Sequence, residues 1–240
     1  MANTVNYAQQ FLYGGYRLTP QVNAYSKTLS TDALDATTFG NSDRTKRYAA
    51  GLKGVGKSFD GFWDGTVDGG MFDLQTLSDV PLSECLSDGS VGSFAELLPC
   101  MLGEHLVVSA PVGQLATMRV GVMASGRHIR GQILHNGSAT GNIAGGTAVQ
   151  IGALLSTQTI VAALHVFSGT GSFIVKIQSD DNSSFTSATD RITFATVATG
   201  TPQSYEIASL VGAITDDYWR IVATNPNTRD FAVVAGIKTT

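Results

Sequence analysis

The sequence has little charge and no excess of basic residues. Only 14% of its 240 residues are charged, against about a quarter of an average soluble chain. The formal net charge is −4, so the electrostatic signature of a nucleic-acid-binding protein is missing. The one basic cluster, formed by Arg44, Lys46 and Arg47, shares its segment with Asp43. A solvated loop or a contact with an acidic neighbour therefore fits this cluster better than DNA binding.

Cysteine and long apolar runs are also scarce. Two cysteines, Cys85 and Cys100, do not make a disulfide framework in a chain of this size. Both are expected to be small buried residues, with a disulfide between them as the alternative. No window of about 18 apolar residues is found, so no membrane-spanning helix and no membrane partner are expected. The opening MANTVNYAQQ lacks the apolar core of a signal peptide.

The abundant residues are those of strands and tight turns. Twenty-seven glycines accompany many Thr, Ser, Ala and Val residues. Apolar and polar residues alternate with a period of two, which is typical of half-buried strands. The alternating segments are 114–123, 129–134, 147–152, 160–167, 172–178, 190–195, 204–207, 218–223 and 229–237. A mainly β fold follows, a sandwich or barrel rather than a βαβ arrangement.

Only two short helices are predicted. The first covers residues 70–77, with Phe72 and Leu77 facing inward and Pro81 beyond its end. The second covers residues 93–98, because Ser93 and Glu96 have the spacing of a capping box. Residues 58–65, with two glycines, favour a strand instead.

Two domains are expected, with a boundary at 135/136. Residues 1–135 carry the short helices and a long loop at 30–57, whereas residues 136–240 read as a regular second β-sandwich. Phe173, Phe194, Trp219 and Phe231 are candidates for its core. Trp219 is expected to be a core anchor, with a sugar-binding platform as the alternative.

The segment 30–57 is long and polar but contains Leu34, Phe39, Tyr48 and Leu52. Loops of this length in compact domains are usually functional or disordered, and scattered large apolar residues argue against simple disorder. A segment that becomes ordered on a neighbouring subunit accounts for both features.

The same region contains a match to the phosphate-binding motif G-x-x-x-x-G-K-[ST], at Gly51, Gly56, Lys57 and Ser58. A functional motif of this kind needs a buried strand before it and a helix after it. The preceding NSDRTKRYAA is not an apolar central strand. The match is therefore interpreted as chance, and no nucleotide cofactor is expected.

No other pattern predicts catalysis or metal binding. The four histidines, His105, His128, His135 and His165, do not fall at metal-ligand spacing. His165 is expected to be a hydrogen-bonded core residue, and His128 and His135 to lie at the surface. Residues 180–184 lack the glycine and glutamate of a calcium loop and favour an Asx-rich turn. The sequence indicates no enzyme, no cofactor and no metal.

Several stretches resemble a known family. LDATTFG (34–40), AGLK (50–53) and FDGFWD (59–64) resemble the major tail proteins of long-tailed bacteriophages. VKIQSDDN (175–182), RITF (191–194), YWR (218–220) and FAVVAGI (231–237) resemble a domain common in phage structural proteins. Together these stretches are spread over most of the chain.

The resemblance implies a virion protein of the phage tail, made in the host cytoplasm, whose copies form stacked rings of a tail tube that conducts DNA during ejection. The implied fold is a tail-tube-like β-sandwich or barrel followed by a second β-sandwich. The resemblance leaves open whether a ring holds six copies or is a pseudo-sixfold trimer. A capsid decoration or neck (head–tail joining) protein is the alternative function.

The implied partners are further copies of the chain and other tail proteins, such as the tape measure and the terminator. DNA would pass without specific binding, which suits an acidic chain. The implied contact loop reaches the adjacent ring. Its candidate residues are Leu34, Thr37, Phe39, Arg44, Lys46, Arg47, Tyr48 and Leu52.

Overall fold

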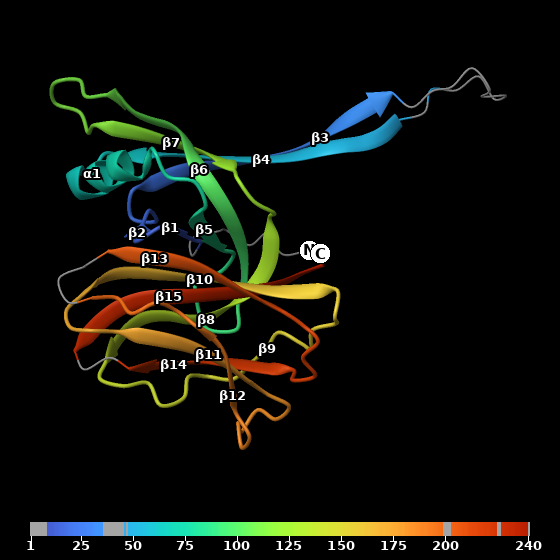
Figure 1. The fold of residues 1–240 in the computed structure, drawn as a ribbon. Coiled ribbons are helices and arrows are strands. Elements are labelled where there is room, and N and C mark those ends of the chain that lie inside the picture. The colour runs from blue at the N-terminus through green and yellow to red at the C-terminus, as the bar shows by residue number, and fades with distance from the viewer. Residues whose placement is uncertain (1–8, 36–45, 47, 199–202, 225–226, 240) are drawn as a thin grey trace, which may run out of the picture.

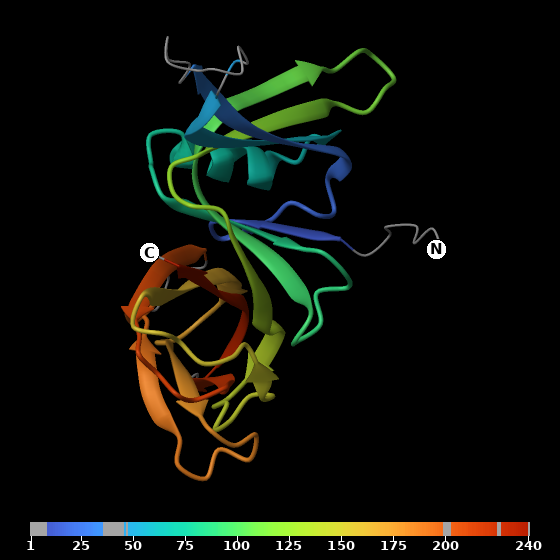
Figure 2. The same ribbon diagram turned by 90° about the vertical axis from the view of Figure 1, so that its right-hand side faces the viewer.

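The computed structural model describes residues 9–35, 46, 48–198, 203–224 and 227–239. Their fold is mainly β, as the sequence predicts, and α1 (Gly65–Leu74) is their one helix. Figure 1 shows two stacked parts, an upper part with α1 and a long projecting hairpin and a lower sandwich. Turned by 90°, the lower part is seen to curl around its own interior (Figure 2).

The strands follow one another along the chain with short connections. Those of the first half are β1 (Gln10–Tyr13), β2 (Tyr16–Arg17), β3 (Val22–Asp35), β4 (Tyr48–Phe62), β5 (Val80–Cys85), β6 (Phe94–Ser109) and β7 (Thr117–Ala124). The others are β8 (Ile129–Thr140), β9 (Val149–Gln150), β10 (Gln158–Gly169), β11 (Ile174–Asp180), β12 (Thr189–Thr193), β13 (Ser204–Val211), β14 (Tyr218–Thr224) and β15 (Thr228–Thr239).

The described strands form two sheets with antiparallel pairing. Eleven strands make one large sheet with the order β13-β10-β15-β8-β6-β5-β1-β2, and β7, β4 and β3 branch from β6. The second sheet has the order β12-β11-β14-β9. Strand β6 is long enough to pair with β5, β7 and β8, so it connects the upper part to the lower one.

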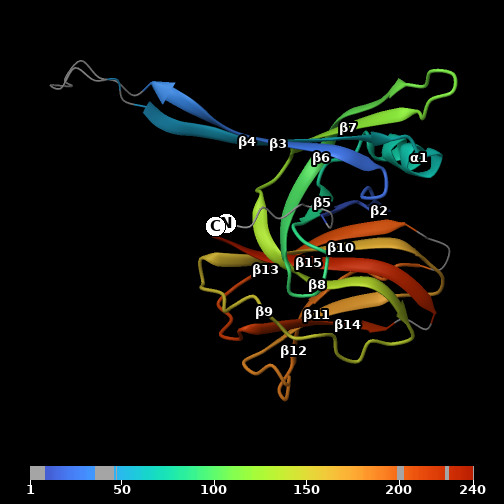
Figure 3. The same cartoon turned by 180° about the vertical axis from the view of Figure 1, so that it is seen from behind.

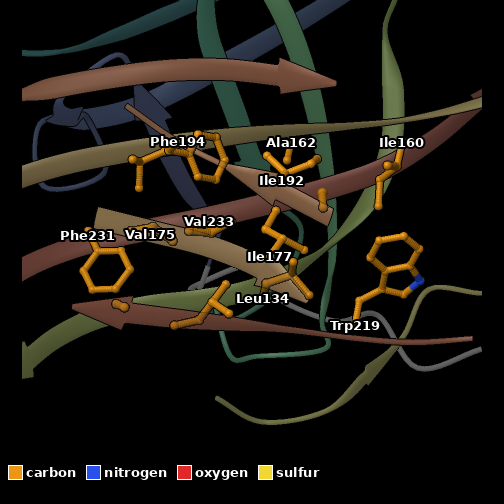
Figure 4. Close-up of a cluster of buried hydrophobic side chains, with 14 of the residues drawn as sticks. Leu134, Ile160, Ala162, Val175, Ile177, Ile192, Phe194, Trp219, Phe231 and Val233 are labelled. Carbon is orange, nitrogen blue, oxygen red and sulfur yellow. The ribbon is translucent and has the colours of Figure 1, made fainter. Parts of the chain in front are cut away.

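Apolar side chains fill the lower sandwich between its two sheets. Trp219, Phe173, Phe194 and Phe231 are all buried there, as predicted, and Figure 4 shows three of these rings with their aliphatic neighbours. The Trp219 indole nitrogen donates to the Gly152 carbonyl at 3.0 Å. Burial of Trp219 rules out its use as an exposed sugar platform.

Two further cores hold the upper part together. One lies between α1 and the strands β1, β4, β5, β6 and β7, and includes Phe59, Met71 and Val120. The other packs residues of β1, β5 and β6, such as Leu97, against β10 and β15. The predicted boundary at 135/136 lies inside β8, whose two ends serve both parts. The division into two domains at this position stays a prediction.

The first predicted helix is misplaced. Helix α1 begins after Asp64, whose carboxylate accepts from the amides of Thr66 and Val67 at 2.9 and 3.2 Å. Its buried face is Val67, Gly70, Met71 and Leu74, a spacing that follows the 3.6-residue period. Phe72 is therefore exposed, and the prediction that Phe72 and Leu77 face inward is wrong.

The second predicted helix, at residues 93–98, is wrong. Residues 94–98 begin β6, and Leu97 pairs with Ser83 of β5 and Ile129 of β8. Ladder pairing on both edges outweighs the local capping signal of Ser93 and Glu96, because a central strand satisfies every backbone group. No helix of the described residues is long and apolar enough to span a membrane.

Candidate assembly site

The most prominent feature is the hairpin of β3 and β4, which extends well beyond the body of the protein (Figures 1 and 3). The two strands pair from Val22 and Gly61 out to Asp35 and Tyr48. The predicted loop at 30–57 is thus wrong for its described residues, since 30–35 and 48–57 are strands. Polar strands can pair with each other across a hairpin without a buried face. The polarity of the sequence alone therefore does not reveal such strands. We call the part beyond residue 29 on β3 and residue 55 on β4 the arm.

Three predicted contact residues lie on the arm with their side chains in solvent. Leu34, Tyr48 and Leu52 are 57%, 61% and 81% exposed. Lys46 is exposed as well. The remaining candidates lie outside the described residues: Thr37, Phe39, Arg44 and Arg47.

The phosphate-motif residues lie in the middle of β4. Gly56 is paired with Thr28 on one side and with Met123 on the other, so its backbone belongs to a ladder and does not form a loop. Strand β4 continues to Phe62 with no helix directly after Ser58. Residues 51–58 thus lie within one strand and do not form the strand–loop–helix setting of a phosphate site; that the match is chance stays a prediction.

The Lys57 side chain points into the protein and is fully buried. Its Nζ lies 2.6 Å from Oε2 of Glu84 and 3.4 Å from Oε2 of Glu96. Lys27 also pairs with Glu96, and the His128 Nε2 lies 2.9 Å from the same carboxylate. We call these five residues the buried ionic cluster. It joins the two strands of the hairpin to β5, β6 and the turn before β8.

The charges of the buried ionic cluster compensate one another. Burial alone would raise the pKa of Glu96, but Lys27, Lys57 and His128 lower it to about 2. The pKa of His128 is lowered, first by burial and then by the two lysines, against the attraction of Glu96. Burial and a hydrogen bond to Glu84 raise the pKa of Tyr25, whose hydroxyl donates to that carboxylate at 2.6 Å. The cluster is thus an anchor at the root of the hairpin.

Sequence reasoning did not find this cluster. Lys57 precedes Phe59 by two residues, so both side chains lie on the same face of β4. This spacing is the signal that could have predicted a charged side chain on the core side of the strand. The sequence favours a helix cap for Glu96 and the surface for His128, whereas the His128 side chain is mostly buried.

The sheet of β3, β4, β7 and the far half of β6 has two unpaired edges among the described strands. Strand β3 pairs with β4 alone. Residues Met101 to Ser109 of β6 pair with β7 alone, since pairing with β5 ends at Cys100. Long open edges readily accept a further strand.

The face of this sheet that is turned away from the core carries small and polar residues together with the exposed side chains of Met101 and Met123. Ser26 and Ser58 lie side by side, with their hydroxyls 2.8 Å apart. Asp60 and Arg119 form an exposed ion pair at 2.7 Å. Gly121, which has no side chain that projects from the sheet, lies on the same face. Met123, whose side chain is exposed, lies on the same surface as Ser26 and Ser58.

The other residues considered in the sequence have structural roles. The His165 ring is buried between the Ser83 hydroxyl, at 2.8 Å, and the Gly14 carbonyl, at 2.6 Å, as predicted. His135 is half-buried and stacks on Phe231 with ring centroids 4.1 Å apart, so its surface assignment is wrong.

Residues 180–184 form an Asx turn, in which Asp180 accepts from the Asn182 amide at 2.9 Å. Cys85 and Cys100 are buried free thiols. Within the described ranges, no group of three or more His, Cys, Asp or Glu residues could hold a metal ion.

Comparison with known proteins gives structural likenesses only. No protein-family model matches the chain, and no curated protein matches it. A chain of the virion of a native gene transfer agent is 11% identical, with a TM-score of 0.43, over 52% of this chain and 96% of that one. A chain of the sheath–tube complex of an extracellular contractile injection system is 13% identical, with a TM-score of 0.40, over 52% and 88%.

The Dit protein of phage SPP1, described as part of a hub adsorption apparatus, is similar over 96% of this chain and 99% of its own, at 9% identity and a TM-score of 0.36. These neighbours come from phage tails and related particles, the class that the sequence resembles. Likenesses this weak carry no function over to this chain.

Proposed function

We propose that this protein is a structural subunit of a phage tail tube, in which copies join into rings and rings stack into a conduit for DNA. The observation that carries the proposal is the arm. It projects from the body (Figure 1) and carries exposed Leu34, Tyr48 and Leu52. A monomeric protein gains nothing from holding such side chains in water on a rigid hairpin, whereas an assembling protein gains their burial.

The two open edges supply the contact within a ring. The β3 edge of one copy can pair with residues 101–109 of β6 in the next copy, which continues one sheet from subunit to subunit. The two edges belong to different strands, so the contact is head-to-tail, and a head-to-tail contact closes into a ring when its rotation permits. Closure would remove both open edges.

The arm supplies the contact between rings. It extends along the strand direction, which is perpendicular to the direction in which the edges pair. If the edges join copies around a ring, the arm points out of the ring toward its neighbour. The face with Ser26, Ser58, Asp60 and Arg119 then lines the lumen, where Asp60 offsets the charge of Arg119 and leaves passing DNA no net positive surface.

We also propose that the protein is located in the virion tail, is synthesised in the host cytoplasm, and contacts the tape measure and terminator proteins. The small number of basic residues, 15 against 19 acidic ones, supports passage of DNA without specific binding.

Negative-stain microscopy and sedimentation of the purified protein test the proposal. We expect the wild type to form rings or tubes at high concentration. The double variant Leu34→Ser/Leu52→Ser should keep its melting temperature but fail to stack, because each buried leucine is worth about 1.5–3 kcal/mol at every contact.

The matched control is Leu155→Ser/Val211→Ser, which changes two equally exposed side chains, 66% and 63%, on the lower sandwich. This control should assemble like the wild type. A wild-type protein that stays monomeric at every concentration would overturn the proposed function.

A further inference from the structure

Large exposed apolar side chains gather at the two ends of the upper part. One group surrounds the β6–β7 turn and the end of α1, and we call it the α1 end. Its members are Phe62, Trp63, Phe72, Leu77, Leu106, Val112 and Leu115. Val112 and Leu115 lie in the β6–β7 turn itself, residues 110–116, which Figure 1 shows as a protruding loop above α1.

The other end holds a groove beneath the root of the arm. It lies between the hairpin and the turn that leads from β7 into β8, and encloses about 660 Å³. Leu29 and Val55 line it with apolar surface, and Leu29 is 63% exposed. Lys53 and Arg127 stand on its walls. We call this site the arm groove.

Helix α1 and the lining of the arm groove carry opposite charge. Helix α1 contains Asp68 and Asp73 and has no basic residue, and Asp73 is exposed. The arm groove contributes Lys53 and Arg127, and both are exposed. An acidic end with apolar side chains therefore complements a basic groove with an apolar lining.

The complementary surfaces cannot meet within one copy. The β6–β7 turn and α1 lie at one end of the upper part and the arm at the other, in both Figure 1 and the reverse view of Figure 3. A contact between them joins two copies head-to-tail along the strand direction and leaves a free groove at one end of the pair. Repetition of this contact gives a stack.

We propose that the α1 end of one copy seats in the arm groove of a second copy in the adjacent ring, with the β6–β7 turn entering the groove. The inference rests on the proposed function and names its inter-ring partner surface. Val112 and Leu115 then lie against Leu29 and Val55, and Asp73 lies toward the basic walls. The arm covers the remaining apolar side chains of the α1 end.

Disulfide trapping between two differently tagged full-length proteins tests this contact. One carries Val112→Cys and the other Leu29→Cys; both positions are exposed, 105% and 63%, so neither change disturbs the fold. The native thiols do not interfere, because burial raises the pKa of Cys85 and of Cys100 to about 12. The mixed proteins are assembled and oxidised with oxidised glutathione.

We expect a mixed-tag dimer at about tenfold the yield of a control, because seated thiols have a high effective concentration. The control pairs Val112→Cys with Val211→Cys, whose side chain is 63% exposed like that of Leu29. Microscopy of the same samples separates the two possible failures. Intact tubes with no more cross-link than the control would overturn this contact and leave the proposed function standing, whereas absence of rings and tubes in the wild type would overturn both.

Discussion

Lys57 lies where the hairpin joins the body, and two carboxylates compensate its charge. Its Nζ is 2.6 Å from Glu84 and 3.4 Å from Glu96, and no part of its side chain reaches solvent. A buried ion pair of this kind adds little net stability over apolar residues, but removal of one partner leaves a buried unpaired charge. The cluster therefore fixes how the hairpin sits rather than how strongly the protein folds.

Replacement of this lysine should be severe. We expect Lys57→Met to lower the free energy of unfolding by about 3–5 kcal/mol, the cost of leaving buried carboxylates without their partner. Lys53→Met is the matched control, because Lys53 lies on the same strand but is exposed, and it should change stability by no more than about 0.5 kcal/mol. Urea denaturation measures both. Equal stability of the two variants would show that the cluster does not hold the root of the hairpin.

Acid should destabilise the protein in two stages. Burial lowers the pKa of His165 to about 4 from its usual 6.5, and the nearby charge of Arg17 adds to this against a hydrogen bond to Gly14. The stability that neutral His165 contributes is complete above pH 6.5 and declines toward pH 4, because only the unfolded chain takes up the proton. The pKa of Glu96, lowered from 4.5 to about 2, adds a second loss between pH 4.5 and 2.

The variant His165→Gln separates the first stage. We measure the free energy of unfolding by urea titration between pH 7 and 4.5. In the variant it should fall less steeply with decreasing pH than in the wild type, by up to about 1.4 kcal/mol per pH unit. An unchanged slope would mean that His165 does not carry the proton-linked stability.

Among the elements, β8 decides whether the lower sandwich can stand alone. It pairs with β15 from Gly131 to Thr140, and its Leu134 is part of the sandwich core. A fragment of residues 127–240 keeps the whole strand. One of residues 136–240, cut at the predicted boundary, loses Leu134 and half of the pairing.

We therefore expect fragment 127–240 to melt cooperatively. Fragment 136–240 should be less stable by at least the about 2–5 kcal/mol that loss of a buried leucine costs. Thermal melting followed by circular dichroism compares the two. Equal stability would place the boundary where the sequence suggested it, and a fragment 127–240 without a cooperative transition would show that the two parts fold as one.

At the scale of the whole molecule, the distribution of apolar surface matters more than its amount. The lower sandwich and the two upper cores bury their own apolar side chains. The upper part leaves two sheet edges and two apolar ends without a partner in the chain's described residues. Edges and ends point in perpendicular directions, so one chain offers separate contacts for closing a ring and for stacking rings. A weakly acidic chain suits a conduit that DNA must leave.

The sequence by itself determined the mainly β class and most strand positions. Alternation with a period of two is a local property, and it survives because each strand buries one face whatever its partners are. It also determined the core of the lower sandwich, including Trp219 and Phe231, and the Asx turn at Asp180. Short polar motifs predicted helices less accurately: Glu96 lies in a strand, and α1 begins before the predicted helix.

Only the tertiary structure decided which charges meet and which surfaces stay open. Lys57 finds its carboxylates 27 and 39 residues away in the sequence, and the register of three strands sets that meeting. The unpaired edges of β3 and β6 follow from strand order, which alternation does not encode. The arm is strand rather than loop because two polar segments pair with each other, a relation between segments that neither segment shows alone.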